Sequence, residues 1–177
     1  MSSIRKTHDL EEVRSAWDRI FRTNDPFEWP FRTGFQAGRV FYPTDGYHLS
    51  ESQYQALCAS IAQSGEREFC ISITESEGPD LLGRTWGHWL WEMPSYGEYA
   101  GLSLTLENAL FSRAGRWGVL ISHEQHALVT GCPQFLTALS AHDPSGPSDL
   151  LRLREAWSDY PRAGWLGKVL SHVRDES

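Results

Sequence analysis

The stretch WGVLISHEQHALVTG, residues 117–131, determines how the chain is expected to fold. Before its centre, Trp117, Val119 and Ile121 occupy alternate positions, and after it comes an apolar run at 127–130 that a glycine ends. Short apolar runs rich in Val, Ile and Trp and bounded by glycine are typical of strands. The sequence therefore predicts two antiparallel strands, joined by a hairpin turn at the central His-Glu-Gln-His.

The same four residues are close to a zinc-protease signature, in which two histidines four apart share a helix face with a glutamate as general base. Here His123 and His126 are three apart, and no third ligand is suggested nearby. Three-residue spacing still permits chelation on a helix. A small hydrolase or transferase that uses His123, Glu124 and His126, with Cys132 or a metal, is therefore an alternative to the solvated turn that the flanking strands favour.

The three cysteines, Cys58, Cys70 and Cys132, are widely spaced and form no Cys-x-x-Cys pair. This pattern indicates reduced thiols rather than a disulfide framework or a zinc ribbon. Cys132 lies at the predicted start of a helix, where free backbone N–H groups and the helix dipole lower a thiol pKa. A nucleophile is one interpretation of this position, and a structural cap or buried thiol is the other.

Outward from the hairpin, the remaining elements follow from periodicity and from start and stop signals. A capping box at Ser50 and Gln53 opens one predicted helix, Pro133 opens another, and Ser148 is expected to cap a third after a linker at 141–148. Helices are predicted over 9–22, 51–64, 133–140, 149–160 and 165–173, and further strands over 38–42, 69–74, 85–93 and 99–112.

Strands in one run, with helices before and after them, are typical of the α+β class. We expect a single α+β domain over residues 1–177, because neither a repeat nor a strong linker divides the chain. Consecutive hairpins predict an antiparallel β-sheet of four to five strands arranged as a meander. The helices are expected to pack mainly on one face of that sheet.

The formal net charge of −7, from 23 acidic and 16 basic residues, argues against nucleic-acid binding and suits a basic partner. No apolar run approaches the length of a membrane helix, and the N-terminal residues lack the apolar segment of a secretory signal. A cytoplasmic protein without membrane association is therefore expected. No P-loop or Gly-x-Gly-x-x-Gly motif is present, so no cofactor is expected, and no metal.

Aromatic and acidic residues are concentrated between positions 80 and 99. Aromatic anchors beside carboxylates suit an interface for a basic protein, because the rings fill pockets and the acids steer the encounter. The predicted contact residues are Asp80, Trp86, His88, Trp91, Glu92, Tyr96, Glu98 and Tyr99. Two alternatives stand beside this interpretation: that half or more of the rings are core, and that two carboxylates form a glycosidase pair.

The run LTLENALFSRAGRWGVLISHEQHALVTGCPQFLTAL, residues 104–139, resembles the C-terminal part of the immunity proteins that bacteria encode beside polymorphic or contact-dependent toxins. In those proteins a tryptophan-led strand, a turn bearing Glu or His, a second strand ending in glycine and a helix opening near a proline recur. The resemblance implies a non-enzymatic cytoplasmic protein that binds a cognate protein toxin and occludes its active site. It implies no catalytic residues. A structural or regulatory subunit is a third interpretation, and the oligomeric state is left open.

Overall fold

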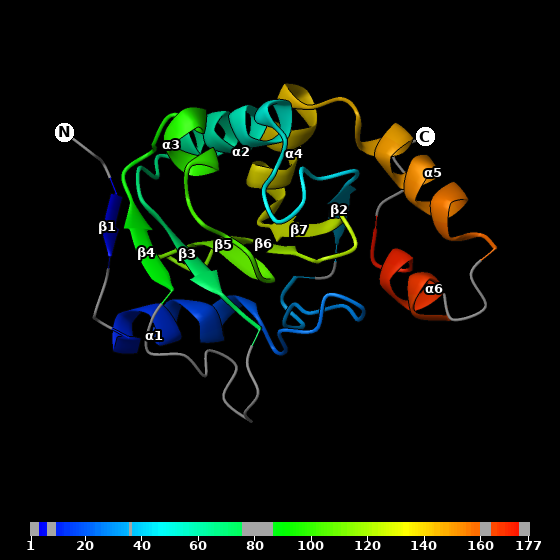
Figure 1. Ribbon diagram of the computed structural model, residues 1–177, viewed down its shortest axis with the longest axis horizontal. Helices are drawn as coiled ribbons and strands as arrows, with labels where there is room; N and C mark the ends of the chain where they lie inside the picture. The colour runs from blue at the N-terminus through cyan, green and yellow to red at the C-terminus, as the bar shows by residue number, and fades with distance from the viewer. Residues whose placement is uncertain (1–3, 7–9, 36, 76–86, 160–163, 174–177) are drawn as a thin grey trace.

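An antiparallel sheet of seven strands forms the centre of the molecule (Figure 1). The computed structural model describes residues 4–6, 10–35, 37–75, 87–159 and 164–173. The strands are β1 (Ile4–Lys6), β2 (Gly38–Phe41), β3 (Phe69–Ile73), β4 (His88–Trp91), β5 (Asn108–Ser112), β6 (Trp117–Ile121) and β7 (Ala127–Gly131). Their order across the sheet is β1-β4-β3-β5-β6-β7-β2, and every neighbouring pair is antiparallel. The predicted α+β class and antiparallel sheet are confirmed, with more strands than the four to five expected.

The predicted meander extends over only part of this sheet. Strands β5, β6 and β7 follow one another as hairpins, but β5 pairs with β3 and not with β4. The chain therefore passes from β4 across β3 to reach β5. The two strands nearest the N-terminus, β1 and β2, add to opposite edges of the sheet, next to β4 and β7.

The hairpin predicted at the centre of residues 117–131 is confirmed. Ile121 pairs with Ala127, and the Ser122 amide donates to the His126 carbonyl at 2.9 Å. Gln125 has a φ of 58°, which closes the turn in the left-handed region. The four residues from His123 to His126 are thus a turn between strands and not part of a helix.

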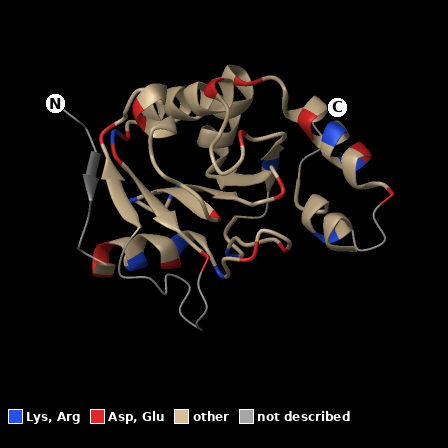
Figure 2. Cartoon of the chain, in the orientation of Figure 1, with Lys and Arg blue, Asp and Glu red and all other residues tan. Residues whose placement is uncertain are grey.

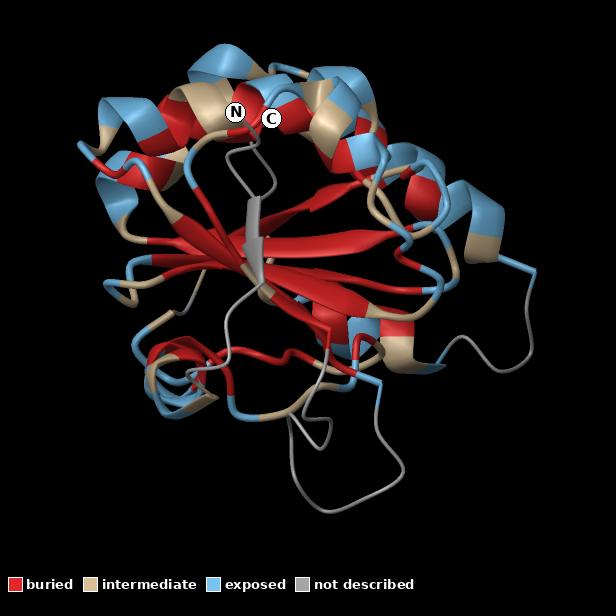
Figure 3. Ribbon diagram, turned by 60° about the vertical axis from the view of Figure 1, so that its left-hand side comes forward, coloured by how far each residue is buried: buried red, intermediate tan, exposed pale blue. Residues whose placement is uncertain are grey.

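Helices cover both faces of the sheet, which corrects the prediction of helices mainly on one face (Figures 1 and 3). We call α2 (Glu51–Gln63), α3 (Tyr96–Ala100) and α4 (Pro133–His142) the first layer. The second layer consists of α1 (Leu10–Ile20), the loop at 21–37, α5 (Gly146–Trp157) and α6 (Gly164–Leu170). The two layers close separate hydrophobic cores against opposite sides of the strands.

The alternation of side chains along each strand explains why the strands were predicted and why the second layer of helices was not. Trp117, Val119 and Ile121 face the first layer, whereas Leu120 and Phe111 face the second, as successive strand side chains must. Every residue of β3, β5, β6 and β7 is buried (Figure 3). A two-residue period identifies a strand, but apolar residues on its second side indicate that a second layer covers it.

Local signals decide where the other elements begin. The capping box of Ser50 and Gln53 at the start of α2 is confirmed. The strand predicted over 99–112 is wrong in its first half, because Ser95 and Glu98 form a second capping box that starts α3. The cap predicted at Ser148 is also wrong: α5 already begins at Gly146, and Ser148 lies in its first turn.

Candidate functional site

The eight residues predicted to contact a partner do not form one surface. Asp80 and Trp86 lie outside the described residues. Trp91 and Tyr99 are 0% exposed and His88 is 1% exposed, so these three side chains belong to the protein interior. Glu92 is exposed, and Tyr96 and Glu98 are half-buried at the surface.

The buried members of this set hold the fold together. His88 Nδ1 lies 2.9 Å from Ser72 Oγ on the neighbouring strand. The Tyr99 hydroxyl accepts a hydrogen bond from the Leu49 amide at 2.9 Å, and its ring stacks on Tyr54 at 4.4 Å. Burial raises the pKa of the Tyr99 hydroxyl. These contacts are those of core residues, in agreement with the alternative that many of the rings are core.

Two of the surface members, Tyr96 and Glu98, lie together with carboxylates from a distant part of the sequence. Burial raises the pKa of the Tyr96 hydroxyl, and the negative charges of Asp45 and Glu51 raise it further. Asp45 lies in the loop before α2 and Glu51 in the first turn of α2, so the fold brings both acids to α3. We call Asp45, Glu51, Tyr96 and Glu98 the α3 patch.

Hydrogen bonds from uncharged donors orient two carboxylates of the α3 patch. Glu98 Oε2 accepts from the Ser95 amide and from the Ser95 hydroxyl, each at 2.9 Å. Glu51 Oε1 accepts from Gln55 Nε2 at 3.0 Å. These serine and glutamine donors are uncharged, and together with Asp45 the two glutamates give this end of the first layer an acidic character.

The three helices of the first layer contain neither Lys nor Arg, and His142, in the last turn of α4, is their one histidine. The segments 40–66, 85–112 and 117–151 contain neither Lys nor Arg, and they include all of α2, α3 and α4. Figure 2 accordingly shows no Lys or Arg on these three helices, whereas α1, α5 and α6 carry them. The helices of the first layer are therefore neutral to acidic, with Arg116 of the β5–β6 turn reaching the Ser64 carbonyl just after α2, and the second layer is mixed.

Uncharged side chains line a hollow of about 390 Å³ between α2 and α4. Its lining residues are Gln63, Pro133, Gln134, Thr137, Ala138 and Ala141. The centre of a protein interface is depleted of charged residues, since desolvating a charge is costly. The first layer therefore combines an uncharged hollow where α2 ends, against α4, with an acidic patch where α2 begins.

The two histidines of the alternative site at His123, Glu124 and His126 lie in different environments. His126 is fully buried: its Nε2 donates to the Pro26 carbonyl at 3.0 Å, and its Nδ1 accepts from Ser122 Oγ at 2.8 Å. Burial lowers its pKa to about 4. His123 instead faces solvent and Glu107, at 2.7 Å from Glu107 Oε1. In the part of the chain that the structure describes, no group of three or more His, Cys, Asp or Glu is arranged to hold a metal ion.

Cys132 is far from the histidines that could activate it. It caps α4 at the end of β7, whereas His126 precedes the start of that strand, a separation of about 20 Å at the usual rise per strand residue. His142 ends the same helix, about 15 Å from its start. Burial raises the pKa of the other thiols, Cys58 to about 11 and Cys70 to about 12, which keeps them protonated.

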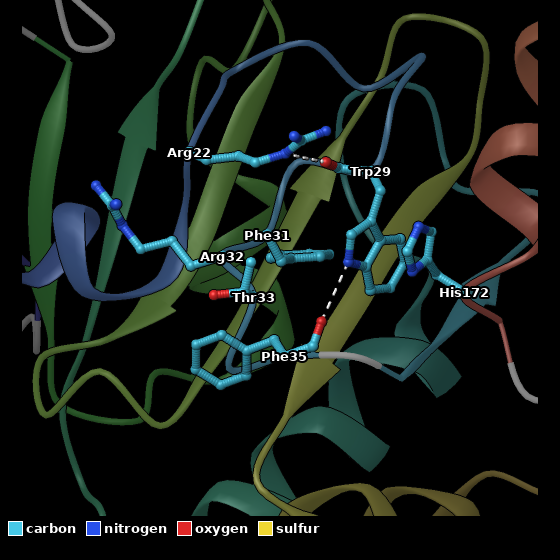
Figure 4. Close-up of a pocket in the computed structure, with 7 residues that line it drawn as sticks. All are labelled: Arg22, Trp29, Phe31, Arg32, Thr33, Phe35 and His172. Atoms are coloured by element: carbon cyan, nitrogen blue, oxygen red, sulfur yellow. Dashed lines mark hydrogen bonds between the residues drawn. The ribbon is translucent and has the colours of Figure 1, made fainter.

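A second hollow, of about 470 Å³, lies in the second layer under the loop at 21–37 (Figure 4). It is lined by Arg22, Trp29, Phe31, Arg32, Thr33, Phe35 and His172. The sequence analysis predicts no site here, because the proline-containing stretch between the helix at 9–22 and the strand at 38–42 has neither helical nor strand periodicity. The available signal was the alternation of arginine with aromatic residues in FRTNDPFEWPFRTGF, residues 21–35.

None of the described helices is long and apolar enough to cross a membrane. Comparisons of the chain with protein-family models, with curated proteins and with solved structures found no match. The proposals below therefore depend on the geometry and charge of the described residues.

Proposed function

We propose that this chain is a non-enzymatic binding protein that docks a basic protein partner on its first layer, as an immunity protein docks a cognate toxin. One observation carries the proposal: α2, α3 and α4 contain no Lys or Arg, while the α3 patch gathers carboxylates from two separate segments at one end of the layer. A basic surface would meet attraction and no opposing charge on these helices.

The two parts of the first layer have different roles in this proposal. The carboxylates of the α3 patch attract a basic surface and orient it, which increases the association rate more than the final affinity. The uncharged hollow between α2 and α4 receives a partner side chain with little desolvation cost. Tyr96 is half-buried, and its ring centroid lies 5.9 Å from that of Tyr54. It supplies an aromatic anchor.

An immunity role fits this charge pattern for a physical reason. Toxins that cleave nucleic acids need a basic cleft, because their substrate is a polyanion. An acidic protein surface competes for such a cleft and closes it by steric occlusion. Inhibition of this kind requires no catalytic residue in the present chain.

The test is co-expression of the chain with the protein encoded beside its gene, followed by purification of the complex and measurement of cell growth. We expect Asp45→Lys/Glu51→Lys to weaken the complex at least tenfold and to abolish protection from a toxic partner. Reversing two charges in the α3 patch replaces attraction by repulsion at the point of encounter.

The matched control is Glu11→Lys/Asp159→Lys, which makes the same change in net charge at two exposed positions of the second layer. Glu11 lies in the first turn of α1, as Glu51 lies in the first turn of α2, so the local cost to each helix is similar. Equal loss of binding in both double variants, or in neither, would contradict the proposed surface.

A further inference from the structure

The hollow under the loop at 21–37 is built on a rigid frame. Phe21 and Phe31 form an antiparallel bridge, and the Arg22 amide donates to the Pro30 carbonyl at 2.8 Å. The Arg32 amide donates to the Ile20 carbonyl at 2.9 Å. These bonds fold the loop back on the end of α1, so the shape of the hollow exists before any ligand arrives.

Aromatic rings form the floor and one wall of the hollow (Figure 4). The Trp29 indole stacks on the His172 ring at 4.8 Å with an interplanar angle of 12°, and meets Phe31 edge-on at 4.9 Å. Its Nε1 donates to the Phe35 carbonyl at 3.1 Å, which fixes the ring orientation. Gly38 makes room for this indole, because a Cβ there would lie 2.5 Å from the ring. Because Trp29 is 6% exposed and Phe31 is 1% exposed, a ligand reaches only the edge of the indole, and the half-buried rings of Phe35 and His172 offer the wider aromatic surface.

Arg22 places a guanidinium group across the top of the hollow (Figure 4). Its Nε donates to the Trp29 carbonyl at 2.9 Å, and this contact orients the remaining N–H groups. Glu28 lies 3.9 Å from Arg22 and Asp18 lies 3.9 Å from Arg32, so each arginine has a carboxylate at the outer limit of an ion pair. The site thus supplies oriented donors with little excess charge, which suits a singly charged carboxylate.

We infer that this hollow binds a small planar aromatic carboxylate, with its ring against Phe35 and the accessible edge of Trp29 and its carboxylate at Arg22. The volume of about 470 Å³ lies within the range of small-molecule sites. The described lining residues include two arginines and no acid, although the chain as a whole is acidic. This site is separate from the proposed protein-binding surface, which lies on the other side of the sheet.

The experiment is a titration of the full chain with three probes that share one ring and differ in charge: indole-3-acetate, indole-3-acetamide and tryptamine. We expect indole-3-acetate to bind at least tenfold more tightly than the neutral amide, and the cationic amine to show no saturable binding. Arg22→Gln should reduce the affinity for indole-3-acetate to that for indole-3-acetamide. The affinity of the variant for indole-3-acetamide should stay within twofold of that of the unchanged chain. Arg67→Gln is the control, because Arg67 precedes β3, at the opposite end of that strand from the loop contact between Asn24 and Thr74.

A second variant tests the site without changing Arg22, whose loss also removes a contact within the loop. Thr33 is exposed at the rim of the hollow, so a tryptophan at this position should fill the site. Thr33→Trp should therefore abolish binding of both indole-3-acetate and indole-3-acetamide. Its unfolding midpoint should stay unchanged. Binding of indole-3-acetate that survives in both Arg22→Gln and Thr33→Trp would overturn the inference. Equal affinity for all three probes, or no saturable binding of any of them, would also overturn it.

Discussion

The two helical layers of this molecule bury similar cores and present different surfaces. Each layer closes on the sheet with a fully buried tryptophan, Trp117 under the first and Trp17 under the second. The first layer excludes Lys and Arg from all of its helices, whereas the second mixes both signs and places two arginines around a hollow. Buried apolar side chains stabilise both layers in the same way. The layers differ in the charges at the exposed positions of their helices, and these charges determine what each layer can bind.

If both layers contribute to stability, removing a core ring should destabilise the chain from either side. We expect Trp91→Ala, beneath the first layer, and Trp17→Ala, beneath the second, to lower the free energy of unfolding by about 3–5 kcal/mol each. Urea unfolding followed by circular dichroism measures this. A change below about 1 kcal/mol for Trp91→Ala would show that its ring is not core and would return it to the list of possible partner contacts.

The next largest effect concerns the connection between the layers. Arg39 on β2 contacts Asp143, which follows α4 and precedes α5, with Nη2 at 2.8 Å from Oδ2 and Nη1 donating to the carbonyl at 2.8 Å. The side chains of this pair are 8% and 12% exposed. Because removing one partner leaves a buried charge, Arg39→Gln should cost about 3 kcal/mol.

The control for this ion pair is Arg32→Gln, whose partner Asp18 is 3.9 Å away and half-exposed. An exposed pair of this kind contributes at most about 1 kcal/mol. Equal losses in Arg39→Gln and Arg32→Gln would mean that the link from α4 to α5 does not depend on the buried charge.

A smaller effect concerns the pH dependence of stability, which we expect to arise in part from His126. His126 joins the hairpin to the second layer, since it donates to Pro26 and stacks on Trp165 of α6 at 5.1 Å. Burial lowers its pKa from 6.5 to about 4, so between these values the unfolded chain binds more protons than the folded chain. Stability is therefore complete above about pH 6.5 and falls as the pH drops towards 4, by at most about 3 kcal/mol.

His126→Gln should remove this part of the pH dependence, whatever its cost at neutral pH. His123→Gln is the matched control, because His123 is exposed on the same turn. The measurement is the free energy of unfolding at pH 7.5, 6 and 5 for each variant. An unchanged slope in His126→Gln would assign the acid sensitivity to other groups.

The sequence was sufficient for elements that local signals define. The hairpin at 117–131, the capping box at Ser50 and Gln53 and the proline-led start of α4 depend on residues within a few positions of one another. The pairing of β5 with β3, and the second layer over the other side of the strands, depend on contacts between distant segments. Periodicity within one strand carries little information on such contacts.

The candidate surfaces were harder to predict for the same reason. Tyr96 and Glu98 were predicted as contacts, but Asp45 and Glu51 joined them only through the fold. Trp91 and Tyr99 were assigned to the surface on composition alone, and burial places both in the core. The lack of Lys and Arg in three long segments was visible in the sequence, but its meaning required knowing that α2, α3 and α4 lie side by side (Figure 1).

The most direct test of the docking proposal is hydrogen exchange of the backbone amides, measured on the chain alone and in complex with the basic protein that co-purifies with it. The account predicts slower exchange in α2, α3 and α4 and in residues 45–50 when the partner is bound, with α1, α5 and α6 unchanged. Slower exchange confined to α1, α5 and α6, or no difference in either layer, would contradict docking on the first layer.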